Sequence, residues 1–123
     1  MLAAFGRNYG LDQDLALKLG RAFGAGMGMG RTCGAVTGAL MVLGFKAGRS
    51  ENEREARYRT YDLVKSFWTG FEQSHGTTVC QELLGVDLAT EEGRRLAVEN
   101  KLFSTVCPAF VETAARLLSE IRP

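Results

Sequence analysis

Several features that mark common protein classes are scarce in this chain of 123 residues. It has only two prolines and no low-complexity tract, which argues against a disordered chain. Lys and Arg number 15 against 14 Asp and Glu, so the net charge of +1 gives no reason to expect nucleic acid or an anionic membrane as a partner. The central uncharged stretch, residues 32–45, is shorter than the roughly 20 apolar residues of a membrane-spanning helix. We therefore expect no membrane insertion.

Cysteine and histidine are also scarce, with three cysteines and one histidine. An odd number of widely spaced cysteines does not fit the disulfide framework of a small secreted protein. The first residues lack the basic start and long apolar run of a secretory signal, so we expect a cytoplasmic protein. No Cys-x-x-Cys pair is present, so a metal site of three cysteines and His75 has weak support. A surface histidine at a helix end is the more common case.

The sequence predicts an all-α protein. A hydrophobic share of 46% and a charged share of 24% are ordinary for a folded globule, and the length suits a single domain over residues 1–123. Helix signals recur along the chain, and no run alternates as a strand would. We expect a compact bundle of about six helices. Their expected cap or first-turn residues are Asp12, Thr32, Ser50, Thr78, Thr90 and Pro108. The apolar residues expected to face the core of their helices are Leu15, Leu19, Tyr61, Val64, Trp68 and Phe71.

Glycine is concentrated beside one cysteine. Residues 24–40 contain six glycines and Cys33, although each glycine weakens a helix by about 1 kcal/mol relative to alanine. Such a segment would let backbone amides or a bound group come close to the sulfur. Gly28, Gly30 and Arg31 are therefore candidates for binding a cofactor there. A dinucleotide-binding GxGxxG or a Walker phosphate loop is excluded, because its required residues are missing.

A second pair of glycines, with apolar residues near the N-terminus, predicts self-association. Gly34 and Gly38 would let another helix approach closely across a symmetry axis. Leu2 and Phe5 would leave apolar surface that a monomer covers poorly. We expect a homodimer, since two-fold dimers are the commonest small assemblies.

All three cysteines are expected at helix N-termini. Cys33 follows Thr32, Cys80 lies two residues after Thr78, and Cys107 precedes Pro108. Free N–H groups and the positive end of a helix stabilise a thiolate and lower a cysteine pKa. Cys33, with its glycine-rich surroundings and neighbouring cationic side chain, is the expected reactive thiol. The alternative is that the cysteines are small packing residues of a helical binding or assembly module.

These motifs resemble a known family. Residues 33–38 read Cys-Gly-Ala-Val-Thr-Gly, the letters ELLG follow soon after Cys80, and Cys107 is followed by proline. The ordered set resembles the family of proposed redox-active proteins named C_GCAxxG_C_C, over essentially the whole chain. The resemblance implies a small helical protein with four functional cysteines, three of which are Cys33, Cys80 and Cys107. The first has no counterpart here, and we expect the reading frame to encode it upstream of Met1, within about two helical turns.

Two functions follow as hypotheses. The first is a cytoplasmic redox protein in which Cys33, Cys80 and Cys107 converge, either to cycle through a disulfide with a redox partner protein or to hold an iron–sulfur cluster or another thiolate-bound metal for electron transfer. The second is the helical binding module with structural cysteines. Convergence of the three sulfurs distinguishes these hypotheses.

Overall fold

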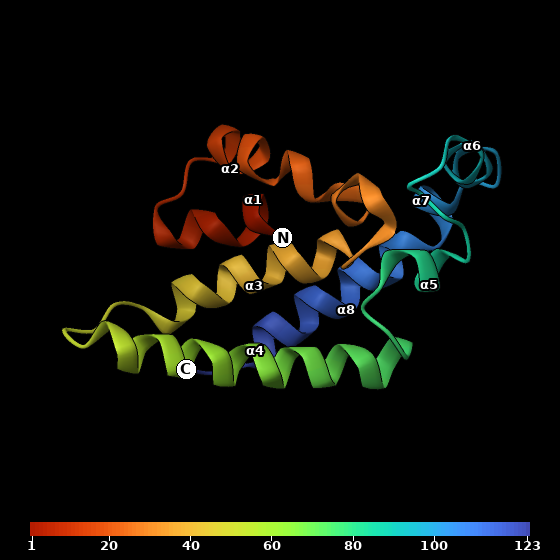
Figure 1. Cartoon of the computed structure of the whole chain (residues 1–123). Coiled ribbons are helices and arrows are strands. Elements are labelled where there is room, and N and C mark those ends of the chain that lie inside the picture. The colour runs from red at the N-terminus through yellow and green to blue at the C-terminus, as the bar shows by residue number, and fades with distance from the viewer.

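The computed structural model describes all residues, 1–123, and consists of helices joined by short loops (Figure 1). The α-helices are α1 (Leu2–Phe5), α2 (Gln13–Gly20), α3 (Gly34–Ala47), α4 (Glu53–His75), α5 (Cys80–Leu84), α6 (Glu91–Glu99), α7 (Leu102–Thr105) and α8 (Cys107–Glu120). Three short segments have other helical types: η1 (Gly6–Tyr9) and η2 (Arg21–Phe23) are 3-10 helices, and η3 (Gly26–Gly30) is a π-helical turn. The all-α prediction is confirmed. The expected count of about six helices is close, since α1 and α7 are single turns. None of the helices combines the length and apolar character that crossing a membrane requires.

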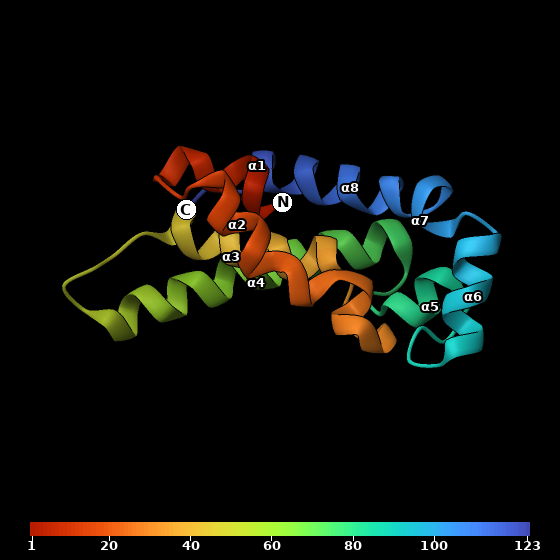
Figure 2. The ribbon, with the colours of Figure 1, turned by 90° about the horizontal axis from the view of Figure 1, so that it is seen from above.

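Helices α3, α4 and α8 contact one another and enclose the core. In Figure 1, α1 and α2 lie on one side of α3 and α4 lies on the other. Seen from above, α5, α6 and α7 gather at one end, opposite the loop between α3 and α4 (Figure 2). The side chains that are fully buried between the three central helices are Val36, Ala39, Val42, Leu43, Phe67, Phe71, Ala114 and Leu118. This core fixes where α3 and α8 begin, and each begins at a cysteine or directly after one.

The predicted buried face of α4 is only partly correct. Phe71 is buried, but Tyr61 is 56% exposed, and Val64 and Trp68 are only half-buried. The face toward the core instead follows Leu63, Phe67 and Phe71, one residue away from the expected stripe. Because adjacent residues are about 100° apart on a helix, an error of one residue shifts the predicted stripe to the edge of the buried face.

The predicted buried face of α2 is wrong. Ala16 is buried, whereas Leu15 and Leu19, and Leu17 between them, are about half exposed. Helix α2 contacts α1, and the face of α2 that carries Ala16 is the one turned toward α1 and α3. The larger leucines on the other faces of α2 are therefore left toward solvent.

Helix ends follow local caps where nothing competes with them. The side chains of Asp12 and Thr90 accept hydrogen bonds from the backbone N–H groups of Leu15 and Gly93, and Pro108 lies in the first turn of α8, as expected. Ser50 was expected to cap α4, but Asn52 does so, with its side chain accepting from two backbone N–H groups.

The starts predicted at Thr32 and Thr78 are wrong. Thr32 forms an isolated antiparallel bridge with Val79, so α3 begins at Gly34 and α5 at Cys80. The backbone N–H and C=O groups on either side of the bridged pair form hydrogen bonds across the bridge, so they do not need a longer helix to supply their partners.

The surfaces from which a dimer was predicted are covered by the same chain. Leu2 is buried and Phe5 half-buried in the core cluster. A Cβ on Gly34 would lie 2.9 Å from the carbonyl oxygen of Phe23, and one on Gly38 would lie 2.9 Å from the Cβ of Met1. These glycines therefore allow close packing within one molecule, and they no longer argue for contact with a second.

Candidate functional site

Cys33 and Cys80 are held together by backbone pairing. The N–H of Cys33 donates to the carbonyl oxygen of Thr78 at 2.8 Å, and the N–H of Cys80 donates to that of Arg31 at 2.6 Å. These two hydrogen bonds flank the bridge between residues 32 and 79. Because neighbouring side chains of extended backbone point to opposite faces, the two cysteines, each one residue beyond the bridged pair, share a face. The bridge thus places the first turns of α3 and α5 side by side.

Cys107 joins the other two cysteines at one cavity. It is the first residue of α8, and its thiol lies beside those of Cys33 and Cys80 at a cavity of about 330 Å³. The remaining residues around the cavity are Met1, Gly24, Ala25, Gly34, Ala35, Phe103, Phe110 and Val111. The prediction that all three thiols lie at helix starts is confirmed. Three cysteines that are far apart in the sequence thus line a single cavity.

The glycine-rich segment positions the bridge through an unusual backbone. Four successive residues, 25–28, have left-handed backbone angles, including the non-glycine residues Ala25 and Met27. Left-handed geometry costs a residue with a side chain about 1–2 kcal/mol, so this turn is strained. The N–H of Arg31 donates to the carbonyl oxygen of Gly26 at 3.1 Å and closes the turn. The chain then enters the bridge directly.

The three residues predicted to bind a cofactor lie around this turn and do not line the cavity. Gly28 is exposed, and Gly30 is buried where a Cβ would lie 3.3 Å from the Cβ of Gln81. The side chain of Arg31 is exposed, and its carbonyl oxygen accepts from Cys80. In this structure all three belong to the backbone support of the cysteines. Their contact with a cofactor stays a prediction.

Residues 1–121 match the family described as "Putative redox-active protein (C_GCAxxG_C_C)". The chain belongs to this family. No match is found among curated proteins or among solved structures. The resemblance predicted from the motif at residues 33–38 and from the two later cysteines is therefore confirmed over nearly the whole chain.

Burial sets the acidity of the thiols in this C_GCAxxG_C_C protein. Cys33 and Cys80 are 8% and 6% exposed, and loss of solvent raises the pKa of both and of the half-buried Cys107. The nearby backbone N–H groups of Ala35 and Val36 act in the lowering direction on the pKa of Cys33, but by less than burial raises it. The lowered thiol pKa expected from the helix N-termini is therefore wrong. The free energy lost when a thiolate is removed from water is larger than the stabilisation that the partial positive charge of a helix N-terminus provides.

The three thiols also oppose one another's ionisation. A negative charge on Cys33 raises the pKa of both Cys80 and Cys107, and a charge on Cys107 acts further on Cys80. The sulfurs are therefore close enough for each charge to be felt by its neighbours. Near neutral pH the three thiols of this C_GCAxxG_C_C site are therefore protonated. More than one thiolate accumulates only when a positive charge takes the place of the lost protons.

Alkylation at neutral pH is expected to modify Cys107 first. Cys107 is half-buried, whereas Cys33 and Cys80 are buried. The reagent reacts faster with a thiol that it can reach from solvent. This reverses the sequence-based expectation that Cys33 reacts fastest. Mass spectrometry of peptides after short exposure to iodoacetamide measures the order, with the unfolded protein as control. Faster labelling of Cys33 than of Cys107 in the native protein would contradict the geometry described here.

Stability is expected to fall in alkaline solution. Burial and the charges of Cys33 and Cys107 raise the pKa of Cys80 from the ordinary value of 9.0 to about 11. The folded state holds this proton more tightly than the unfolded state. Its contribution to the free energy of unfolding is therefore complete below about pH 9 and is lost as the pH rises through about 11. Urea unfolding across this range measures the fall, and Cys80→Ala should flatten it. An unchanged slope in that variant would assign the effect to other groups.

His75 does not line the cysteine cavity and stands at the end of α4, as expected, but it is half-buried and not a surface residue. Its Nε2 lies 2.8 Å from Oγ1 of Thr113, and its ring centroid lies 4.9 Å from those of Phe71 and Phe110. It therefore closes the end of α4 against α8. As the side chains stand, no three Cys, His, Asp or Glu residues are arranged to hold a metal ion, and this includes the predicted ligands Cys33, Cys80 and Cys107.

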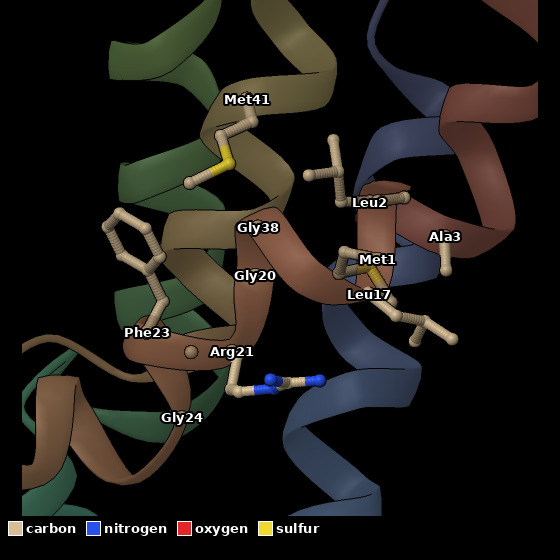
Figure 3. Close-up of a pocket in the computed structure, with 12 residues that line it drawn as sticks. Met1, Leu2, Ala3, Leu17, Gly20, Arg21, Phe23, Gly24, Gly38 and Met41 are labelled. Carbon is tan, nitrogen blue, oxygen red and sulfur yellow. The ribbon is translucent and has the colours of Figure 1, made fainter. Parts of the chain in front are cut away.

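A second cavity, of about 270 Å³, lies between α1, α2 and α3 (Figure 3). It shares Met1, Gly24 and Gly34 with the cysteine cavity but contains no thiol. Arg21 supplies its one charged side chain. Met1 therefore lies at the boundary between the two cavities.

Sequence reasoning missed the apolar wall of the cysteine cavity. Ala25, Phe103, Phe110 and Val111 carry no motif, and the last three line the cavity only because α7 and α8 return to the start of α3. The one local signal is the place of Phe110 and Val111 in the first turns of the helix that begins at Cys107.

Proposed function

We propose that this chain is a thiol redox protein whose Cys33, Cys80 and Cys107 act as one site. The observation that carries the proposal is their convergence: three cysteines from three helices line one apolar cavity. The family description, which names redox activity, supports the same function. Cysteines that served only as packing residues would have no reason to share a cavity.

The first chemistry that suits this site is reversible disulfide formation. Two of the thiols form an S–S bond and release two protons and two electrons, and a disulfide of a partner protein takes these up to become two thiols. Cys33 is the central thiol, since its charge acts on both others. Cys107, the half-buried thiol, is the one that a partner's disulfide can reach.

The second chemistry is retention of an iron–sulfur cluster or another thiolate-bound metal, for which thiolates are suitable donors. Cys33, Cys80 and Cys107 would hold it after their side chains turn toward one another, since no three donors are arranged for a metal ion as the side chains stand. When bound, it would supply electron transfer. Three thiolates that oppose one another's ionisation are stabilised together by a cation.

One preparation tests both chemistries. Protein purified without oxygen is assayed for metal content and visible absorption, and its free thiols are counted after equilibration in dithiothreitol buffers of graded potential. We expect either bound metal in proportion to protein or the loss of two thiols with a defined midpoint. Cys33→Ala should abolish either signal and leave helix content nearly unchanged. The matched control Val111→Ala changes the cavity wall without removing a sulfur and should retain the signal.

The alternative is a helical binding or assembly module with structural cysteines. It predicts no metal and three free thiols in every buffer. The homodimer and the cytoplasmic location expected from the sequence stay proposals. The exposed leucines of α2, in place of the glycines of α3, are now the apolar surface that supports self-association. The mass of the protein in solution tests that proposal.

A further inference from the structure

The cysteine cavity lacks charged side chains. Apart from the three thiols, its lining consists of glycine, alanine, methionine, valine and phenylalanine. Its volume of about 330 Å³ falls within the size range of small-molecule sites. Phe103 and Val111 are 44% and 46% exposed, so the cavity is open to solvent between α7 and the first turns of α8. A small molecule can therefore reach Cys107, the half-buried thiol, and the apolar walls favour an uncharged molecule.

We propose that this cavity admits a small, uncharged, planar electron acceptor of the quinone class, which the cysteines reduce. The inference rests on the dithiol form of the proposed function. A charged acceptor would lose hydration in the cavity and find no charged side chain on its walls to compensate for that loss. A neutral ring loses little hydration, and the rings of Phe103 and Phe110 offer faces or edges against which it can pack.

The reaction balances without any further reactant. Two thiols of the site, Cys33 and either Cys80 or Cys107, form an S–S bond and give up two electrons and two protons. The two carbonyl oxygens of the quinone each take one proton, and the ring takes both electrons to become a hydroquinone. The partner protein of the proposed function, in its dithiol form, then reduces the disulfide back to two thiols.

Tetramethyl-1,4-benzoquinone is the probe that tests this proposal. Its four methyl groups block addition of a thiol to the ring, so oxidation is the reaction that remains. Reduced protein is mixed with it in the absence of oxygen. The loss of quinone absorbance and the loss of free thiols are then followed together. We expect one quinone consumed for each pair of thiols lost, at a rate that saturates with quinone concentration.

A charge placed at the cavity mouth provides the specific control. Val111→Lys adds a cation to the rim, so it should slow oxidation by the neutral quinone and speed oxidation by a naphthoquinone that is sulfonated on its benzene ring and methylated at both quinone-ring positions. We expect the ratio of the two rates to fall at least about tenfold, the effect of about 1.4 kcal/mol. The matched variant Val98→Lys adds the same charge to an exposed valine on α6, outside this cavity, and should leave the ratio unchanged.

The outcomes separate this inference from the function on which it rests. If dithiothreitol buffers convert two thiols to a disulfide but the quinone does not saturate, or Val111→Lys behaves as Val98→Lys does, the thiol function stands and the quinone proposal is wrong. If neither reagent forms a disulfide, the quinone proposal and the dithiol form of the function both fail, and only metal retention is left for the site. Saturation together with a ratio that changes only in Val111→Lys supports both.

Discussion

Replacing Gly26 with alanine is expected to lower the free energy of unfolding by about 3–4 kcal/mol and to disrupt the cysteine site. Gly26 has a φ of +60°, and an added Cβ would lie 2.4 Å from the backbone nitrogen of Arg31 and 2.8 Å from its oxygen. That oxygen accepts the hydrogen bond from Cys80. The backbone must therefore move where it joins the two buried cysteines. Urea unfolding measures the loss, and alkylation should show Cys80 newly accessible.

The matched control is Gly28→Ala, two residues away. Gly28 has the same left-handed geometry, with a φ of +68°, but an added Cβ would meet nothing within 4 Å. Only the backbone preference is lost, so we expect about 1–2 kcal/mol and no change in thiol accessibility. Equal effects of the two substitutions would show that strain in the turn, and not its contact with residue 31, determines the result.

The substitution Gly34→Ala is expected to destabilise the protein by about 2–3 kcal/mol, whereas Gly44→Ala in the same helix should stabilise it by about 0.5–1 kcal/mol. The new Cβ at residue 34 would lie 2.9 Å from the carbonyl oxygen of Phe23, a backbone atom that cannot rotate away. At residue 44 nothing lies within 4 Å, so only the gain in helix propensity remains. Thermal or urea unfolding of the two variants measures these opposite signs. Two stabilising substitutions would mean that η2 is free to move off α3.

Features encoded within a few residues were predicted correctly from the sequence. Asp12, Thr90 and Pro108 mark helix starts because a cap or a first-turn proline acts on the N–H groups next to it. Thr32 and Thr78 carry similar local signals, yet they enter a bridge between segments distant in the chain. The local signals resemble each other in the correct and the incorrect predictions. The incorrect ones are explained by the distant segment with which Thr32 and Thr78 pair.

The candidate site likewise combines features that local sequence determines with features that tertiary packing determines. The positions of Cys33, Cys80 and Cys107 at helix starts follow from local pattern, and their order along the chain was enough to recognise the family. The direction of their pKa shifts was predicted wrongly, because burial depends on how α5 and α8 close over the start of α3. The sequence pattern indicates the helix ends but not the depth at which each sulfur lies.

The bridge between Thr32 and Val79 has a consequence for the order of folding. All of α3 and α4 lies between its two residues, so closing the bridge carries the loop-closure cost of a long segment, and we expect it to close late, once these helices have packed on each other. Cys107 follows later still in the chain and reaches the others when α8 docks. In a newly synthesised chain the three thiols therefore stay separate and open to solvent until the last contacts form. Capture of a metal ion or an oxidant by single cysteines at that stage competes directly with assembly of the site.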